Sequence, residues 1–333
     1  MTPSLLEAAV GATLRWPFRL WAFGEAIALE GVLAAAKELG RADYRQHVAA
    51  LCLASIGSGV GNSYDHHPAG AGAFLDLYAE TGDERFLAAV RAVIELHERM
   101  PRNPRGALLV RAHHPGWRHQ IWVDSMDVIG PLFARYAEVT GEQNRYEQAL
   151  ALTLAHARLL QSDNGLFSHG FDTYAGRNGH FWARGNGWAL LGMVETLIRS
   201  PASTAGWAEL SERLDALLAA LLRSQRPSGL WSTVVDRDES YEETTLAAMV
   251  VAGIAAAGKA GLVDADKFVR LIASAHAAVV AHVGHDGVLD RVSEATPVGQ
   301  FSTYATRPFG SFPWGQGPLL LMLCRHQEGS VEG

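Results

Sequence analysis

The sequence predicts an all-α fold of the (α/α)6-barrel type, a closed ring of helix pairs, and three observations support this prediction. Apolar residues recur at helical spacing through most of the chain. The helical segments alternate between segments that are apolar on most sides and segments that carry charge on one face. A glycine followed by apolar residues also recurs at intervals of about 60 residues, the length of two helices with their connections.

The expected helices fall into two kinds. Helices of the first kind are rich in Gly, Ala and large apolar residues and should be buried on most sides, whereas those of the second kind should bury one stripe. The expected inner helices lie near 70–81, 123–139, 184–198, 241–258 and 315–326. The expected outer helices lie near 83–99, 142–162, 204–224 and 263–282. Further helices are expected near 2–15, 16–38 and 41–55.

Two kinds of connection separate these helices. Short turns built on a glycine follow inner-type helices, and an acidic residue starts the next helix after Gly82 and after Gly141. Longer loops follow outer-type helices, and strand signal is confined to short pieces of them. The glycines of these longer loops are Gly106, Gly165, Gly229 and Gly287. We therefore expect the long loops to gather at one end of the ring.

Repeated helix pairs fit either an open solenoid or a closed ring. A solenoid would expose polar terminal repeats and a long concave face. Here the segments near both ends are apolar, with Leu5 and Leu6 at one and residues 319–323 at the other. Closing the ring buries both segments, so we expect a single (α/α)6-barrel domain over residues 1–333.

The composition limits the classes of function. The chain has 333 residues, of which 48% are hydrophobic and 19% charged, and its formal net charge is −7. Because it has no basic tract, neither nucleic acid nor a membrane is an expected partner. No apolar run is long enough to span a bilayer and no signal peptide is evident, so a cytoplasmic protein is expected. The sequence does not indicate an oligomeric state.

Cysteine usage gives no sign of a disulfide or a metal centre. Cys52 and Cys324 both lie in apolar, helix-like runs, so we expect buried free thiols. Neither residue belongs to a CxxC arrangement, and no cluster with the spacing of a zinc site is evident. The sequence therefore predicts no bound metal.

The stretch from His119 to Phe133 contains the first candidate catalytic group. Asp124 follows Trp122 where a polar loop becomes an apolar helix, and Asp127 comes one helical turn later. A carboxyl that is desolvated against an indole has a raised pKa, which suits a general acid near neutral pH. However, Asp is a preferred N-cap and Asp-x-x-Asp resembles a capping box, so both carboxylates have a structural alternative.

The other long loops should share one rim, and they are rich in aromatic, histidine, arginine and acidic residues. Several indoles in converging loops suit a sugar cleft, because flat rings stack on pyranose faces while polar groups bind hydroxyls. The candidate residues of this cleft are Asp65, His113, Trp122, Asp124, His169, Trp182, Arg184 and Trp188.

Most of these residues also have a structural explanation. Asp65 fits an Asx-turn before a helix, and Arg184 fits a cap on a neighbouring helix. The histidines and tryptophans fit hydrogen-bonded loop positions and the core. Glu242 and Glu243 fit a helix N-terminus, where the helix dipole favours acids, and we expect this structural role for the pair.

At these residues the chain resembles a known family. The matching pieces include Tyr-Asp65-His-His-Pro, Gln120-Ile-Trp-Val-Asp124, Gly165-Leu-Phe-Ser-His169-Gly, Trp182-Ala-Arg-Gly-Asn-Gly-Trp188 and Tyr241-Glu-Glu-Thr-Thr. The piece ending at Trp188 is the most specific. On these motifs the chain is similar to glycoside hydrolase families 105 and 88, the unsaturated rhamnogalacturonyl and glucuronyl hydrolases, and most similar to family 105.

The resemblance implies an (α/α)6-barrel enzyme whose substrate is an unsaturated oligosaccharide made by a lyase. Such an enzyme releases a 4,5-unsaturated uronic acid from the non-reducing end of the oligosaccharide. Asp124 matches the general acid and base, which protonates C4 of the double bond and activates water at C5. Asp65 matches a second carboxylate, which raises the pKa of the acid by like-charge proximity. The substrate-pocket positions match His113, Trp122, His169, Trp182, Arg184 and Trp188. No metal or organic cofactor is implied.

The chain departs from the family pattern after Asp124, where Ser125-Met-Asp127 replaces the usual Gly and large apolar residues. Asp127 is therefore a second candidate acid. Three other functions stay open. They are an inverting glycosidase with carboxyls about 6.5–9.5 Å apart, an epimerase that uses His113 and His169, and a non-enzymatic helical scaffold.

Overall fold

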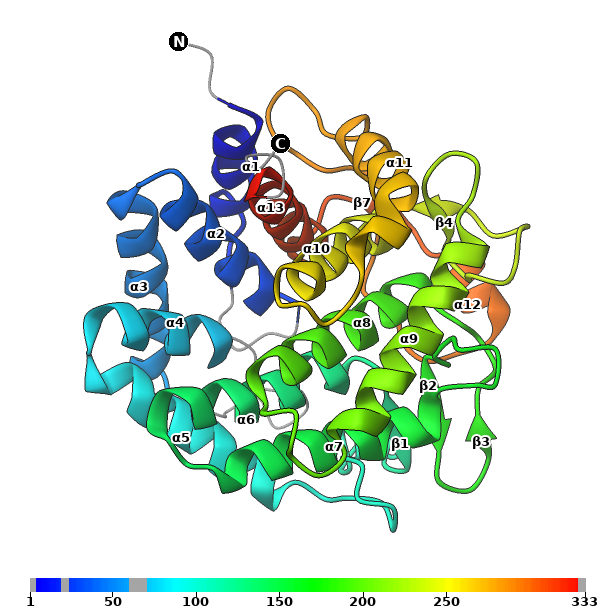
Figure 1. Ribbon diagram of the computed structural model, residues 1–333, viewed down its shortest axis with the longest axis horizontal. Helices are drawn as coiled ribbons and strands as arrows, with labels where there is room; N and C mark the ends of the chain where they lie inside the picture. Colours follow the sequence, from blue (N-terminus) through cyan, green and yellow to red (C-terminus); the bar gives the residue numbers. More distant parts are fainter. Residues whose placement is uncertain (1–3, 19–23, 60–70, 329–333) are drawn as a thin grey trace.

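The computed structural model describes residues 4–18, 24–59 and 71–328, and it is a ring of paired helices (Figure 1). The helices of the first half are α1 (Leu5–Leu14), α2 (Ala26–Glu38), α3 (Ala42–Gly57), α4 (Ala71–Thr81), α5 (Glu84–Arg99), α6 (Ser125–Thr140) and α7 (Asn144–Leu160). Those of the second half are α8 (Ala183–Arg199), α9 (Trp207–Ser224), α10 (Thr245–Lys259), the 3₁₀ helix η1 (Ala265–Phe268), α11 (Val269–Val280), α12 (Phe301–Ala305) and α13 (Pro313–Glu328).

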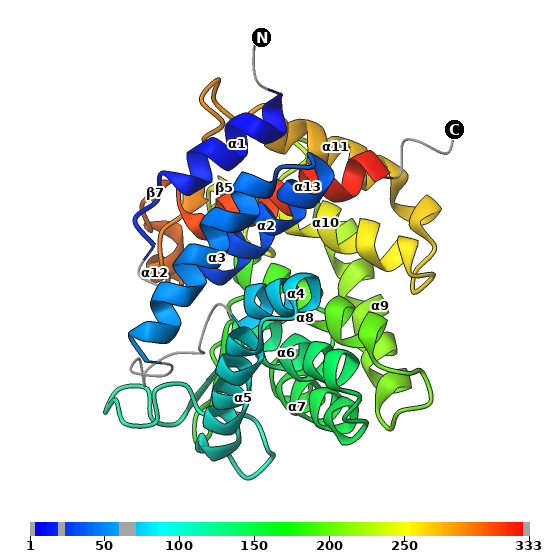
Figure 2. The same ribbon diagram turned by 90° about the vertical axis from the view of Figure 1, so that its left-hand side faces the viewer.

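The inner ring is closed. Helices α2, α4, α6, α8, α10 and α13 each contact the next, and α13 returns to α2. Helices α3, α5, α7, α9 and α11 each contact the inner helix that precedes or follows them, and α1 lies against α13 (Figures 1 and 2). The predicted (α/α)6 barrel is therefore confirmed, and the open solenoid is excluded because the first and last described helices meet.

The loops at one end of the ring repeat the same geometry. Gly165, Gly229 and Gly287 all have positive φ, at 91°, 88° and 81°. A Cβ at each would come within 2.1–2.4 Å of a backbone atom of the next outer helix, on α9, α11 and α1 respectively. Each of these three loops therefore lies directly on the following outer helix, and the last of them lies on α1. This contact explains the glycine repeat in the sequence.

Burial follows the expected difference between inner and outer helices. On α10 every residue from Thr245 to Ile254 is buried. On α9 the buried residues form one stripe, and they are Leu210, Leu214, Leu217, Leu218, Ala220 and Leu221. The inner helices are thus surrounded by protein, while the outer helices present their charged faces to solvent.

The structure differs from the prediction in three places. The helix expected over 16–38 is described only from Ala26, with residues 19–23 outside the described parts. The helix expected from residue 241 begins at Thr245, because Glu242 and Glu243 form a short strand. Helix α12 was not expected, since five residues are too short for a periodic pattern to indicate.

The contact between α6 and α8 depends on Gly192. A Cβ at this position would lie 2.1 Å from the carbonyl oxygen of Met126, which is backbone and has no freedom to move alone. Because Met126 follows Asp124 closely, this close approach also fixes the start of α6 relative to α8.

We expect Gly192→Ala to lower the free energy of unfolding by about 1–3 kcal/mol, the usual cost of overpacking a core. Gly57→Ala is the matched control, because Gly57 lies on the exposed end of α3 with no atom within 4 Å of the added Cβ. Denaturant unfolding of both variants measures the difference. Equal stability of the two variants would contradict the described approach of α6 to α8.

Candidate active site

Three short strands hold the loops of the candidate site together. β1 (Gln120–Trp122) pairs antiparallel with β2 (Gly170–Asp172), which pairs with β3 (Gly176–Arg177), and Trp122 lies opposite Gly170. The N–H of Val123 donates to the carbonyl of His169 at 3.0 Å, which extends the pairing by one step. This register brings His169 beside Asp124, the residue that precedes α6.

Asp124 is a buried carboxylate and does not cap its helix. Its exposed fraction is 4%, and its side chain makes no capping hydrogen bond although it occupies the N-cap position of α6. Its Oδ2 lies 3.3 Å from Nε2 of His169, which is fully buried. The two atoms are within ion-pair distance but are not aligned as a hydrogen bond. The N-cap hydrogen bond that the sequence allowed for Asp124 is therefore absent.

Aromatic rings surround this pair. The ring of His169 lies 4.3 Å from that of Trp182 and 5.4 Å from that of Trp122, measured between centroids. Trp117 packs on the other side of Trp122, and Tyr304 contacts His169 edge-on. Three of the predicted residues, Trp122, His169 and Trp182, thus meet around Asp124.

Burial lowers the pKa of His169 below its ordinary value. The carboxylate of Asp124 acts in the opposite direction, and the guanidinium of Arg184 adds to the lowering. Because desolvation is the largest of these effects, His169 is a neutral imidazole at neutral pH.

Arg184 is held in the wall by backbone oxygens. Its Nη1 donates to the carbonyl of Ser293 at 2.7 Å and its Nη2 to the carbonyl of Glu294 at 2.9 Å. The guanidinium lies over the rings of Trp182 and Trp314 at 4.4 and 5.6 Å. Burial lowers its pKa to about 10, so the group remains a cation at neutral pH. Part of its donor fork is thus occupied before any ligand binds.

The motif from Trp182 to Trp188 positions α8 within the site. Asn186 is fully buried, and its side chain accepts from the N–H of Phe167 at 2.8 Å and donates to the carbonyls of Phe167 and Trp182, each at 3.0 Å. Trp188 is 1% exposed and belongs to the core. The motif therefore ties the loop that carries His169 to the helix that carries Arg184.

One predicted residue lies apart from this group, and another cannot be placed. His113 is exposed on the loop before β1, while Trp117 of the same loop reaches Trp122. Asp65 lies outside the described residues.

Glu243 corrects the expected role of the acidic pair before α10. It lies on β5 (Glu242–Glu243), which pairs with β4 (Trp231–Ser232), and Thr244 occupies the N-cap position. Its side chain is fully buried, and its Oε2 accepts from the N–H of Ser293 at 3.4 Å. The acidic pair therefore does not belong to the helix N-terminus, and the sequence carried only a weak signal for a buried strand of two residues.

Buried polar atoms without a hydrogen-bond partner gather at this end of the described chain. Native proteins leave few such atoms, and functional sites are one of the places where they occur. Those on the loops and strands of the candidate site are Asp124 Oδ2, His169 Nε2, Trp182 Nε1, Thr233 Oγ1 and Glu243 Oε1. Their donors and acceptors suit a ligand rich in hydroxyls and carboxylates.

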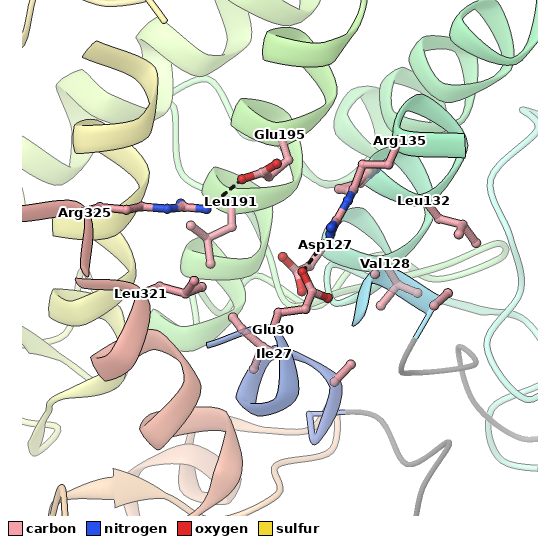
Figure 3. Close-up of a pocket in the computed structure, with 14 residues that line it drawn as sticks. Ile27, Glu30, Asp127, Val128, Leu132, Arg135, Leu191, Glu195, Leu321 and Arg325 are labelled. Atoms are coloured by element: carbon pink, nitrogen blue, oxygen red, sulfur yellow. Dashed lines mark hydrogen bonds and ion pairs between the residues drawn. The ribbon is translucent and has the colours of Figure 1, made fainter. Parts of the chain in front are cut away.

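Asp127 faces a different space, deeper in the ring. It lines a cavity of about 70 Å³ together with Glu30, Arg135, Glu195 and Arg325 (Figure 3). Burial raises the pKa of Asp127 well above its ordinary value, and the charges of Glu30 and Glu195 add to the rise. The ion pairs of Arg135 with Glu30 and of Arg325 with Glu195 cross the same region. Asp127 therefore belongs to a charged layer of the barrel interior.

The described residues contain neither a metal-binding cluster nor a membrane-spanning helix. Within them no group of three His, Cys, Asp or Glu side chains is arranged to hold a metal ion. Among the same residues, no helix has the length and apolar character needed to cross a membrane.

Comparison with known proteins gives a consistent result. The model of the family Glycosyl Hydrolase Family 88 matches residues 12–328. The unsaturated rhamnogalacturonyl hydrolase YesR of Bacillus subtilis is 30% identical over 259 residues, which cover 75% of this chain and 73% of that protein. The chain therefore belongs to Glycosyl Hydrolase Family 88, a family of glycosidase-type hydrolases.

Solved structures share the fold. A possible member of the GH105 family from Klebsiella pneumoniae superposes with a TM-score of 0.89 at 23% identity, covering 98% of this chain and 93% of that one. The unsaturated glucuronyl hydrolase of Bacillus sp. GL1 superposes with a TM-score of 0.75 at 17% identity, covering 99% and 97%. At these identities the likeness concerns the fold.

We expect Asp127→Asn to raise the free energy of unfolding near pH 7. A carboxyl whose pKa is raised on folding contributes stability that is complete below its unfolded pKa and is lost as pH rises through its folded pKa. An amide does not ionise, so the variant does not lose stability as pH rises. The gain in the free energy of unfolding over the wild type should therefore be larger near pH 7 than near pH 4.

Asp215→Asn serves as the control, because it removes the same charge from an exposed position of α9 and should change stability by no more than about 0.5 kcal/mol. Denaturant unfolding at both pH values measures each effect. A gain for Asp127→Asn that does not vary with pH would contradict the raised pKa.

Proposed function

We propose that this member of Glycosyl Hydrolase Family 88 removes the 4,5-unsaturated uronic acid residue from the non-reducing end of oligosaccharides by hydrating its double bond. The observation that carries the proposal is the buried Asp124 carboxyl beside a neutral histidine and two indoles. The printed function of the Bacillus subtilis relative, an unsaturated rhamnogalacturonyl hydrolase, supports the same substrate class.

The chemistry adds water across an enol ether. Asp124 in its acid form gives a proton to C4 of the sugar, and the positive charge that develops at C5 is shared with the ring oxygen. The carboxylate then takes a proton from a water molecule as that water attacks C5. The resulting hemiketal opens and expels the aglycone. One carboxyl thus acts as general acid and then as general base, and it ends in its starting form.

The surrounding residues have matching roles in this proposal. Nε2 of His169 lies 3.3 Å from Oδ2 of Asp124 and is proposed to orient its carboxyl once substrate is bound, and the half-buried Trp122 offers a flat face to the sugar. Trp182 is buried against His169 and Arg184, so it is proposed to form the wall of the pocket. Arg184 contributes positive charge close to Asp124, which suits the carboxylate of a uronic acid.

Asp65 and His113 keep their predicted roles as proposals, whereas the predicted substrate contact of Trp188 is replaced by a supporting role. Asp65 remains the proposed second carboxylate. His113 is proposed to contact the substrate from its exposed loop, where the next sugar would leave the cleft. Trp188, which is buried in α8, is proposed to support the wall behind Trp182.

We further propose that the protein forms one domain and works in the cytoplasm. Its two cysteines are free and buried, which suits a reducing compartment.

The pair Asp124→Asn and Asp127→Asn tests the assignment of the acid. Both changes replace a carboxyl by an amide on the same stretch of chain, one helical turn apart. We expect Asp124→Asn to lower kcat/KM about 10²–10⁴-fold, the usual contribution of general acid–base catalysis. Asp127→Asn should retain activity, because its side chain lines the interior cavity.

The assay follows loss of the enol ether's ultraviolet absorbance with unsaturated disaccharides made by a pectin lyase and by a glycosaminoglycan lyase. Full activity of Asp124→Asn would overturn the proposal. Cleavage of the saturated disaccharide at an equal rate would indicate an ordinary inverting glycosidase. Conversion of the sugar to its epimer with the enol ether intact, lost in His113→Ala and His169→Ala and retained in Asp124→Asn, would indicate an epimerase.

A further inference from the structure

We infer that Tyr304 and Asn178 are positioning residues that hold His169 in the tautomer with its hydrogen on Nε2, facing Asp124. The inference follows from the direction of each hydrogen bond in a chain of four residues. Only its effect on catalysis depends on the proposed function.

The hydroxyl of Tyr304 is the centre of this chain. Tyr304 lies on α12 and is fully buried. Its oxygen lies 2.9 Å from Nδ1 of His169, 2.9 Å from Nδ2 of Asn178 and 3.3 Å from the backbone nitrogen of Gly299. Three nitrogen atoms thus surround one phenolic oxygen.

Backbone groups fix the orientation of Asn178. The N–H of Gly170 donates to Oδ1 of Asn178 at 3.2 Å, and a backbone N–H has no other role available. The amide oxygen therefore faces Gly170, and the NH₂ group faces Tyr304 and the carbonyl of Gly299, which lies 3.4 Å away. In the opposite orientation the NH₂ group would face the N–H of Gly170, and the amide oxygen would face the carbonyl of Gly299. Two donors and two acceptors would then oppose each other.

The hydrogen of the Tyr304 hydroxyl then has one acceptor left. A tyrosine hydroxyl has one hydrogen to donate and two lone pairs that accept. Asn178 and Gly299 both donate to its oxygen and occupy the lone pairs. Its hydrogen must therefore go to Nδ1 of His169, which has to be the bare nitrogen of the ring.

It follows that the hydrogen of His169 is on Nε2, which lies 3.3 Å from Oδ2 of Asp124. The same count disfavours the imidazolium form, because an N–H at Nδ1 would be a third donor to one oxygen. Tyr304 thus keeps His169 neutral and keeps its donor directed at the proposed acid. The contact is long and is not aligned as a hydrogen bond, as is common for catalytic hydrogen bonds before substrate binds.

Nitrogen NMR of the histidine-labelled protein measures the tautomer directly, because bare and protonated ring nitrogens resonate apart. A His169→Gln variant assigns the signals among the 14 histidines. In the wild type without substrate we expect a bare Nδ1 and a protonated Nε2. A hydrogen on Nδ1, or on both nitrogens, at neutral pH would overturn the inference.

Asn178→Asp tests the direction of the chain with almost no change of shape. An ionised carboxylate only accepts, so the hydroxyl of Tyr304 should turn to residue 178 and its oxygen should accept from His169. The hydrogen should then move to Nδ1, and kcat/KM should fall about 10- to 100-fold, by analogy with the loss of a partner that orients a metal-bound histidine.

Tyr304→Phe removes the donor and should also release the tautomer. Tyr136→Phe is the matched control, since it removes a hydroxyl that bonds Glu142 on the hairpin side of α6 and should leave both tautomer and activity unchanged.

Lower activity in Asn178→Asp with the hydrogen still on Nε2 would give the two residues a merely structural role and overturn the inference. Should Tyr304→Phe fail to fold, Asn178→Asp decides the question alone. A wild type with the expected tautomer but without activity on unsaturated sugars would overturn the proposed function and leave the tautomer assignment standing.

Discussion

The antiparallel contact between residues 120–123 and 169–172 is the constraint on which the candidate site depends. It joins two loops that belong to different helix pairs, and it places Asp124 and His169 side by side at the end of the barrel. A slip of one residue would turn the side chains of a strand to its other face, so the register matters as much as the pairing. The inner helices support this contact, because α6 starts directly after Asp124 and is fixed against α8 by Gly192.

Buried charged and polar groups are paired differently in the candidate site and in the barrel interior. In the interior, Arg135 and Arg325 are paired with carboxylates, and the remaining Asp127 has a raised pKa. At the loop end, several buried polar atoms have no partner, and one histidine is kept neutral by burial and by a tyrosine hydroxyl. Such unsatisfied polar atoms are costly in a folded protein and indicate where a polar ligand replaces the missing partners.

The sequence was sufficient for the fold and for part of the site. Helical periodicity and the glycine repeat predicted the ring, because three of the four long loops leave no room for a Cβ where they meet the next outer helix. Trp122, Asp124, His169 and Trp182 were found from their loops. Tyr304 was not, since its contact with His169 spans 135 positions and its helix has only five residues. The role of Glu243 was wrong, because a two-residue strand leaves no periodic signal.

The most direct test of the account is a crystal structure of the Asp124→Asn variant with an unsaturated disaccharide bound. The account predicts that C4 of the unsaturated ring lies about 3–3.5 Å from the side chain of residue 124, the distance of a reactive contact, with the ring against Trp122. A sugar bound in the interior cavity beside Glu30 and Arg135, or one whose C4 points away from residue 124, would contradict it.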